Sequence, residues 1–159
     1  MKSHRLVREQ WIHRPVDEVF EFFADAGNLE TITPPWLKFR ILTPRPISMR
    51  SGALIDYTLR VRFLPVKWRT EIVNWSPPSQ FVDQQLRGPY RLWHHLHEFF
   101  PDGDKTRMRD TVDYALPLGP LGELAHVGWV RRDLNQIFDY RGAKIQELLG
   151  ADPAFTPRD

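Results

Sequence analysis

The hydrophobic and polar positions of this chain change period twice, which divides the chain into a helical, a strand-rich and a second helical part. Residues 5–12 mix apolar and charged side chains and predict a first strand. Behind Pro15, apolar side chains recur at three- and four-residue steps, at Val16, Val19, Phe20 and Phe23. This spacing predicts a short amphipathic helix. A second short helical turn is predicted over residues 28–33, because Pro34 and Pro35 follow it.

From residue 37 to residue 116 the period is two, which is the period of strands. Six strands are predicted, at residues 37–43, 53–63, 66–75, 80–87, 90–100 and 106–116. Proline and glycine separate them, including a turn at Leu64-Pro65 and a hairpin turn at residues 101–104. Connections this short join antiparallel neighbours, since a parallel crossover needs a dozen or more residues.

Residues 121–149 contain no proline and return to the helical period. The apolar stripe of this segment consists of Val127, Val130, Leu134, Ile137, Phe138, Ile145 and Leu148, with Arg141 and Gly142 interrupting it. As one helix the segment would be about 40 Å long. No other predicted helix is long enough to cover the sheet. The sequence therefore predicts an α+β fold: a curved antiparallel sheet of six or seven strands, two short helices after the first strand, and a long C-terminal helix over a cavity.

Composition narrows the class of protein. The 159 residues fit a single domain over residues 1–150, and we expect residues 151–159 to be a disordered tail. Six Trp and ten Phe suit an aromatic core or an apolar pocket. The net charge of +2, with basic and acidic residues interspersed, gives no nucleic-acid footprint. The absence of cysteine excludes disulfides and thiolate chemistry. Without a signal or membrane segment, we expect a soluble cytoplasmic protein, a monomer or a weak homodimer.

Polar side chains on the inner faces of two strands are the candidates for chemistry. His95 and His97 share a face with Trp93, and on the next strand Asp110 and Tyr114 share a face with apolar residues. Asp83 and Gln85 join them if these two residues lie on the inner face of their strand, which the pattern leaves open. A ligand-binding interpretation places these groups around the polar part of an apolar ligand, with His95 and Asp110 as the acid–base pair. The alternative is a satisfied internal hydrogen-bond network without a ligand.

The predicted cavity wall combines strand and helix residues. Its apolar members are Ile55, Tyr57, Trp68, Ile72, Trp93, Met108, Val112, Leu134 and Phe138. Two histidines two apart on a strand, with Asp110 or Asp83, could also ligate an ion. We expect no metal and no cofactor, because no tight ligand motif accompanies the pair.

Several stretches resemble a known superfamily. They are residues 28–36 (NLETITPPW), 75–78 (WSPP), 88–90 (GPY), 93–97 (WHHLH) and 114–122 (YALPLGPLG). With the order of elements, they resemble the START-related helix-grip (SRPBCC) superfamily over residues 5–149. The nearest branch is the small bacterial one described as polyketide cyclase/dehydratase-like, as ligand-binding, or as cell-division-inhibitor-like. Its members stand alone or precede an epimerase-like domain, and this chain is expected to be the stand-alone form.

The resemblance implies an apolar cavity for a lipid-, sterol- or polyketide-like molecule. Binding of such a hydrophobic ligand is the function that we expect from the sequence. One alternative is a cyclase/dehydratase-like enzyme that uses His95 and Asp110, and another is a regulatory protein-interaction module. The resemblance does not choose among them, because one fold hosts many functions.

Overall fold

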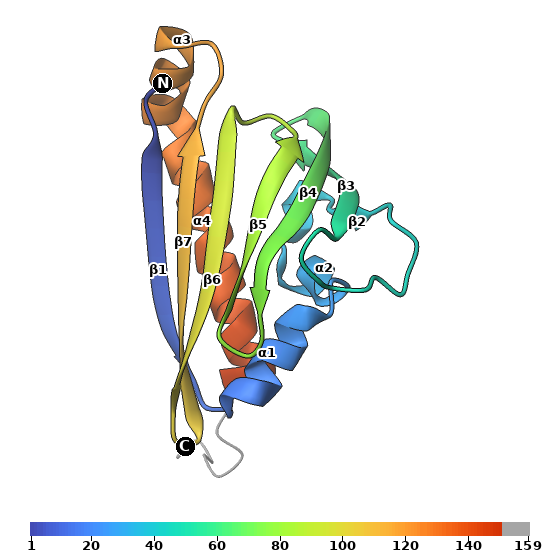
Figure 1. The fold of residues 1–159 in the computed structure, drawn as a ribbon. Helices are drawn as coiled ribbons and strands as arrows, with labels where there is room; N and C mark the ends of the chain where they lie inside the picture. The colour runs from blue at the N-terminus through green and yellow to red at the C-terminus, as the bar shows by residue number, and fades with distance from the viewer. Residues whose placement is uncertain (151–159) are drawn as a thin grey trace.

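The structure is a computed structural model that describes residues 1–150, so the tail expected at 151–159 lies outside the described residues. One seven-stranded sheet forms its frame, in the order β1-β7-β6-β5-β4-β3-β2, with every neighbouring pair antiparallel (Figure 1). The strands are β1 (His4–Ile12), β2 (Arg40–Ile41), β3 (Leu54–Val61), β4 (Leu64–Ser76), β5 (Gln80–Arg87), β6 (Leu92–Asp102) and β7 (Lys105–Ala115). The predicted helix-grip fold is confirmed.

Helical segments cover one face of the sheet. The first two, α1 (Val16–Ala24) and α2 (Asn28–Ile32), follow β1 as predicted. The C-terminal segment continues from α3 (Pro120–Ala125) through a π-helical turn, His126–Val130, into α4 (Arg131–Ile145) and a second π-helical turn, Gln146–Gly150. Figure 1 shows this long segment running behind β1, β7 and β6, while α1 and α2 lie nearer the opposite edge. Within residues 1–150, no helix combines the length and apolar character needed to cross a membrane.

Alternation decides which side of the sheet is buried. In β7, Thr106, Met108, Asp110, Val112 and Tyr114 are all buried, as the period-two pattern predicted. The side chains between them are less buried, because successive residues of a strand point to opposite faces. The side of β7 that faces the helices is therefore buried along the whole strand.

Two predicted strand boundaries were wrong. Strand pairing in residues 37–43 covers only Arg40–Ile41, because a 3₁₀ turn at Pro35–Leu37 precedes it and Lys38 adopts a left-handed conformation with φ 48°. The hairpin between β3 and β4 turns at Arg62 and Phe63 and not at Leu64-Pro65. Pro65 fits inside β4 because that edge position needs no donor there.

The predicted apolar stripe of the last helix was wrong at its beginning. Val127 is 72% exposed, as are the neighbouring Leu121 and Leu124 to a similar degree. The π-helical turn His126–Val130 inserts an extra residue per turn, which shifts the phase of the stripe. From Leu134 onward the stripe is buried at Leu134, Phe138 and Ile145, as predicted. Ile137 is only half-buried and Leu148 is 39% exposed, so the predicted stripe was also wrong at its end.

Candidate functional site

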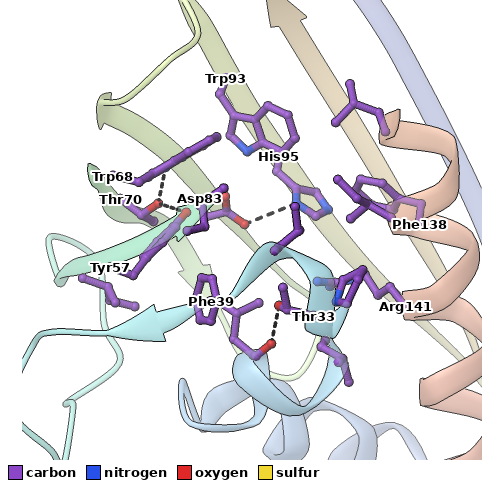
Figure 2. A pocket seen from close by; sticks show the side chains of 18 of the residues that line it. Thr33, Phe39, Tyr57, Trp68, Thr70, Asp83, Trp93, His95, Phe138 and Arg141 are labelled. Atoms are coloured by element: carbon purple, nitrogen blue, oxygen red, sulfur yellow. Dashed lines mark hydrogen bonds and ion pairs between the residues drawn. The ribbon is translucent and has the colours of Figure 1, made fainter. Parts of the chain in front are cut away.

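A cavity of about 430 Å³ lies between the concave face of β3–β6, the short helices and α4. Its wall is mostly apolar and aromatic, which is typical of small-molecule sites of this size. Of the residues proposed from sequence, ten line it: Ile55, Tyr57, Trp68, Ile72, Asp83, Trp93, His95, His97, Leu134 and Phe138. Figure 2 shows the strand residues facing Phe138 and Arg141 of α4 across the cavity.

The β7 residues proposed for the wall do not line the cavity. Met108 and Val112 are fully buried in the core, and Val112 and Tyr114 pack in one cluster with Leu134 and Phe138 of α4. The hydroxyl of Tyr114 hydrogen-bonds Nε2 of His126 at 2.8 Å. Neighbouring core side chains cover these three residues, so the cavity does not extend to them.

Asp110 and Gln85 also lie outside the cavity wall. Asp110 stands behind the two histidines and contacts their ring nitrogens. Gln85 bonds both backbone groups of Tyr90, accepting from its N–H at 3.2 Å and donating to its carbonyl at 2.7 Å. It therefore holds the β5–β6 turn that positions Tyr90, which does line the cavity.

The polar part of the wall is a cluster of two carboxylates and two imidazoles. Nε2 of His95 is 2.8 Å from Asp110, and Nε2 of His97 is 2.6 Å from Asp83. Each histidine also approaches the other carboxylate, with 3.4 Å from Nδ1 of His95 to Asp83 and 3.2 Å from Nδ1 of His97 to Asp110. The two rings stack with centroids 3.7 Å apart. Strand register explains why these four side chains lie together, because Asp83 pairs with His95 and Asp110 pairs with His97 across neighbouring strands.

Burial and neighbouring charges shift the pKa values of the two histidines in opposite directions. Burial and the neighbouring positive charge of His97 lower the pKa of His95, and the carboxylates offset this only in part. Burial also acts to lower the pKa of His97, but hydrogen bonds to Asp110 and Asp83 outweigh it and raise that pKa. His97 is therefore the more basic of the two histidines. His95 is neutral, and with its Nε2–H directed at Asp110 its free lone pair is on Nδ1.

Arg141 completes this cluster and was missed from the sequence. Its Nη2 lies 3.7 Å from Asp110 and 3.5 Å from Nδ1 of His97. Burial alone would raise the pKa of Asp110, but the charge of Arg141 and the histidine hydrogen bonds hold it well below its usual value. The sequence contained a signal, because Arg141 lies three residues after Phe138 and seven after Leu134, on the same helical face.

Thr70 forms a second polar point in the wall that the sequence did not indicate. Its hydroxyl accepts a 3.1 Å hydrogen bond from the indole of Trp68 and lies 3.3 Å from the hydroxyl of Tyr57. These bonds fix the orientation of two stacked rings, whose centroids are 5.8 Å apart. Burial also raises the pKa of Tyr57 well above its usual value, so its hydroxyl stays protonated.

Several residues that line the cavity are also exposed to solvent, and they mark its mouth. Trp36 is 53% and Trp129 43% exposed, and both line the cavity. Arg62, in the β3–β4 turn, spans the opening: its guanidinium lies 5.4 Å from the ring of Trp129 and 3.2 Å from Asp133. Trp36 meets Tyr140 of α4 edge to face at 5.6 Å.

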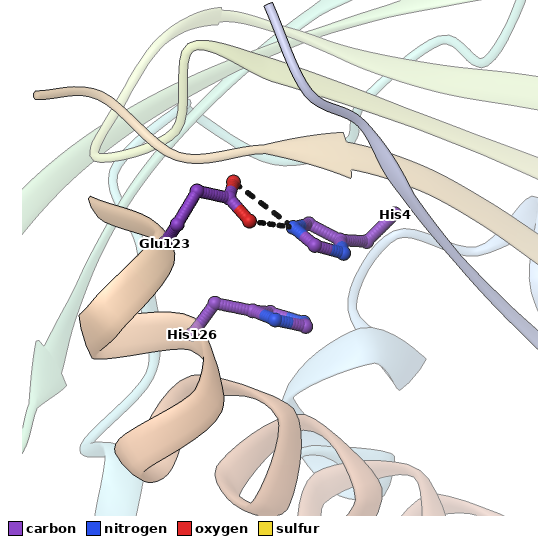
Figure 3. A group of neighbouring side chains, drawn as sticks. All are labelled: His4, Glu123 and His126. Carbon is purple, nitrogen blue, oxygen red and sulfur yellow. Dashed lines mark hydrogen bonds and ion pairs between the residues drawn. The ribbon is translucent and has the colours of Figure 1, made fainter. Parts of the chain in front are cut away.

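Two groups of side chains in the described residues have ligand atoms close enough for a metal ion: Asp83, His95 and His97, and His4, Glu123 and His126. In the first, Arg141 approaches the histidines, and its charge disfavours a cation. The second lies near the start of β1, where His4 and His126 stack at 3.5 Å and Glu123 contacts His4 at 3.1 Å (Figure 3). In both groups the two imidazole rings are stacked, at 16° for His4 and His126 and at 27° for His95 and His97.

Solved structures of other proteins have a fold similar to that of this chain. A START superfamily protein from Mycobacterium smegmatis superposes with a TM-score of 0.68 at 13% identity, over 91% of this chain and 99% of that one. The ZhuI aromatase/cyclase from Streptomyces sp. R1128 superposes with a TM-score of 0.67 at 16% identity, over 92% and 96%. At these identities the likeness concerns the fold alone.

The sequence itself matches the family "polyketide cyclase / dehydrase and lipid transport" over residues 3–144, so the chain belongs to this family. A nucleoside-diphosphate sugar epimerase from Corynebacterium glutamicum contains a similar fold, with 20% identity and a TM-score of 0.67 over 89% of this chain but 28% of that one. No curated protein matches this sequence.

Proposed function

We propose that this protein binds an apolar small molecule in the cavity between the sheet and α4. The observation that carries the proposal is the wall itself. The cavity that it encloses is about 430 Å³, most of its lining side chains are aromatic or aliphatic, and its buried ionisable groups form one cluster. Burial of an apolar ligand there is favourable by about 25 cal/mol per Å² of apolar surface removed from water. Membership of a family that includes lipid transport proteins supports the same class of ligand.

A cavity-filling pair of variants tests this proposal. Ile55→Trp places an indole in the cavity, because Ile55 is 3% exposed and lines the wall. Leu54→Trp is the matched control, since Leu54 precedes it in β3 but is 45% exposed on the opposite face. We expect Ile55→Trp to lose binding of 2-ethylnaphthalene, titrated by calorimetry, and Leu54→Trp to keep it. Equal binding by both folded variants contradicts the proposal.

A second candidate function is cyclase/dehydratase-like catalysis, and the geometry of His95 favours it. This imidazole lines the cavity, is held by Asp110 at 2.8 Å, and has a lowered pKa that keeps it neutral. A neutral imidazole fixed by a carboxylate is the usual form of a general base, and here Nδ1 is the atom that would accept the proton. His95→Gln distinguishes the two functions, because an enzyme loses turnover of a ligand that co-purifies from the native host while a binding protein keeps its affinity.

A further inference from the structure

Asp83 is the most accessible member of the polar cluster in the cavity wall. Its side chain is 20% exposed, whereas each of the other four members is exposed by 10% or less. It also lines the cavity directly, which Asp110 does not. A ligand that enters the cavity therefore meets the charged part of the cluster at the carboxylate of Asp83.

The two oxygens of this carboxylate have different surroundings. Oδ2 lies 2.6 Å from Nε2 of His97 and 3.4 Å from Nδ1 of His95. Within residues 1–150, Oδ1 makes no hydrogen bond, and it is not among the atoms that are both buried and unpaired. Oδ1 therefore keeps accessible surface on a side chain of the cavity wall, and a hydrogen-bond donor in the cavity can reach it.

The wall beside Asp83 is aromatic. Tyr57, Trp68 and Trp93 line the same cavity, and Figure 2 shows them next to Asp83. The ring of Trp93 stands at 89° to that of Trp68, with centroids 5.4 Å apart. The indole N–H of Trp68 and the hydroxyl of Tyr57 both contact the hydroxyl of Thr70, so neither is bonded to Oδ1. A flat aromatic ligand suits this wall, since aromatic rings pack well against one another by edge or offset face.

The chemistry of Oδ1 defines which ligand group fits it. Burial alone would raise the pKa of Asp83, but interactions with His95 and His97 lower it below its usual value. An ionised carboxylate oxygen only accepts hydrogen bonds, so the ligand has to supply the donor. An ammonium group would lose its hydration and share the cavity with the charge of Arg141, which is costly. A hydroxyl group supplies the donor without bringing a charge.

We propose that Asp83 selects the ligand of this cavity, by accepting at Oδ1 a hydrogen bond from the hydroxyl group of an aromatic molecule, that is, a phenol. This inference rests on the proposed function, because it requires an apolar ligand in the cavity. It adds the chemical class of the ligand and the residue that recognises it.

Four probes with one naphthalene ring test the assignment by calorimetry at pH 7, where a phenol is protonated because its pKa is about 10. They are 2-naphthol, 2-methoxynaphthalene, 2-ethylnaphthalene and 2-naphthylmethylamine, of which the second differs from the first by the loss of the donor. Asp83→Asn should bind 2-naphthol about tenfold more weakly than the wild type, as for one hydrogen bond to a charged acceptor. Its affinity for 2-methoxynaphthalene and 2-ethylnaphthalene should change by less than about twofold.

The matched control is Glu71→Gln, which removes a carboxylate from the neighbouring strand β4. Glu71 lies between the buried Thr70 and Ile72, so it is on the opposite face of the strand, and it does not line the cavity. This variant should bind all four probes as the wild type does.

Fluorescence of bound 2-naphthol is a second readout that a merely structural role would not move. The excited state of 2-naphthol is a much stronger acid than the ground state and gives its proton to an acceptor that is hydrogen-bonded to it. The naphthol O–H bond breaks, an O–H bond forms at Oδ1 of Asp83, and the electron pair stays on the naphtholate oxygen. With protein in excess and excitation beyond tryptophan absorption, the wild type and Glu71→Gln should show naphtholate emission. Asp83→Asn should show mainly emission from neutral naphthol.

The outcomes separate the two proposals. If 2-ethylnaphthalene binds and Asp83→Asn keeps the wild-type affinity for 2-naphthol, the role of Asp83 is overturned while apolar binding stands. Emission from neutral naphthol alone in the wild type, or tighter binding of 2-naphthylmethylamine than of 2-naphthol, also overturns it, and both are measured without a variant if Asp83→Asn does not fold. If none of the four probes binds, both this inference and the proposed function fail.

Discussion

Inward- and outward-facing residues alternate along the strands at both ends of the sheet, but the inward-facing residues have different neighbours at the two ends. At the β1–β7 end, α4 lies directly on the strands: Arg8 contacts Asp139 at 2.6 Å, Gln10 donates to the carbonyl of Gly142 at 3.2 Å, and Val112 is fully buried. At the β3–β6 end the inner face meets a cavity of about 430 Å³. The β3–β6 end borders this larger cavity, and the β1–β7 end borders only a smaller hollow of about 290 Å³ next to α4.

The difference lies in what faces the strands and not in the strands themselves. Ile72 and Val112 are both apolar, buried and at inward positions of regular strands. Val112 meets the helix, whereas Ile72 borders space that the short helices and the 3₁₀ turn at Pro35–Leu37 keep open. Burial of a side chain therefore does not identify a core residue in this fold, and mutations can distinguish the two ends.

The largest effect should come from matched truncations at the two ends. Ile145→Ala removes a side chain that is 0% exposed and does not line the cavity, and we expect a loss of about 2–5 kcal/mol in the free energy of unfolding. Ile72→Ala should fall at or below the lower end of that range, because part of its side chain borders the cavity. Urea unfolding measures both, and 2-ethylnaphthalene affinity should change only for Ile72→Ala. Equal losses in unfolding free energy for the two variants, with equal effects on binding, would contradict the difference between the two ends of the sheet.

A smaller effect concerns pH, because only the cavity end contains the coupled histidines. The pKa of His97 is raised, so the folded state holds its proton more tightly than the unfolded state. Its stabilisation is complete below the unfolded-state pKa of about 6.5 and is lost as pH rises through the folded-state pKa. The unfolding free energy of the wild type minus that of His97→Gln should fall above about pH 6.5. A difference that rises with pH instead would contradict the assignment.

The contribution of His95 to stability should depend on pH in the opposite direction. Its pKa is lowered, so the folded state holds its proton less tightly than the unfolded state, and its contribution to stability becomes less favourable as pH falls below about 6.5. The wild type minus His95→Gln difference should therefore decrease toward acid pH. Urea titrations at several pH values measure both variants. Parallel profiles for the two histidines would show that they titrate alike.

The smallest effect should come from arginines at the surface of each end. Arg62 and Arg8 each pair with an aspartate of α4, and exposed pairs of this kind contribute about 1 kcal/mol or less. We expect both Arg→Ala variants to unfold near the wild type. Only Arg62→Ala should speed the release of 2-ethylnaphthalene, measured by stopped-flow fluorescence, because Arg62 spans the cavity mouth. Faster release from Arg8→Ala as well would show that the contact at the mouth is not what limits exchange.

Sequence periodicity predicted the layers well, because strand and helix faces follow from residue spacing alone. The buried side of β7 and the covering helix are examples. Periodicity could not show which inward residues meet the helix and which meet the cavity, since this depends on where α4 crosses the sheet. Met108 and Val112 were placed in the wall for that reason, although their burial was predicted correctly.

The polar cluster was predicted only in part. Alternation brought His95, His97 and Asp110 to one side of the sheet, and strand register then placed Asp83 beside them. Arg141 was treated as a break in the apolar stripe of its helix, because a charge is normally a sign of exposure. Its partners lie on strands about 30 to 45 residues earlier in the chain, so no local pattern shows that the charge is balanced.

The most direct test of the central claim is to locate a bound apolar molecule by isotope-filtered NMR, with unlabelled 2-ethylnaphthalene and methyl-labelled protein. We predict intermolecular nuclear Overhauser effects to the methyl groups of Ile55, Ile72 and Leu134, which line the cavity, and none to those of Val112 and Ile145, which are buried elsewhere. Contacts confined to exposed side chains such as Leu121 and Val127, or no contacts at all at saturating probe, would contradict the claim that the cavity end of the sheet is a ligand-binding site.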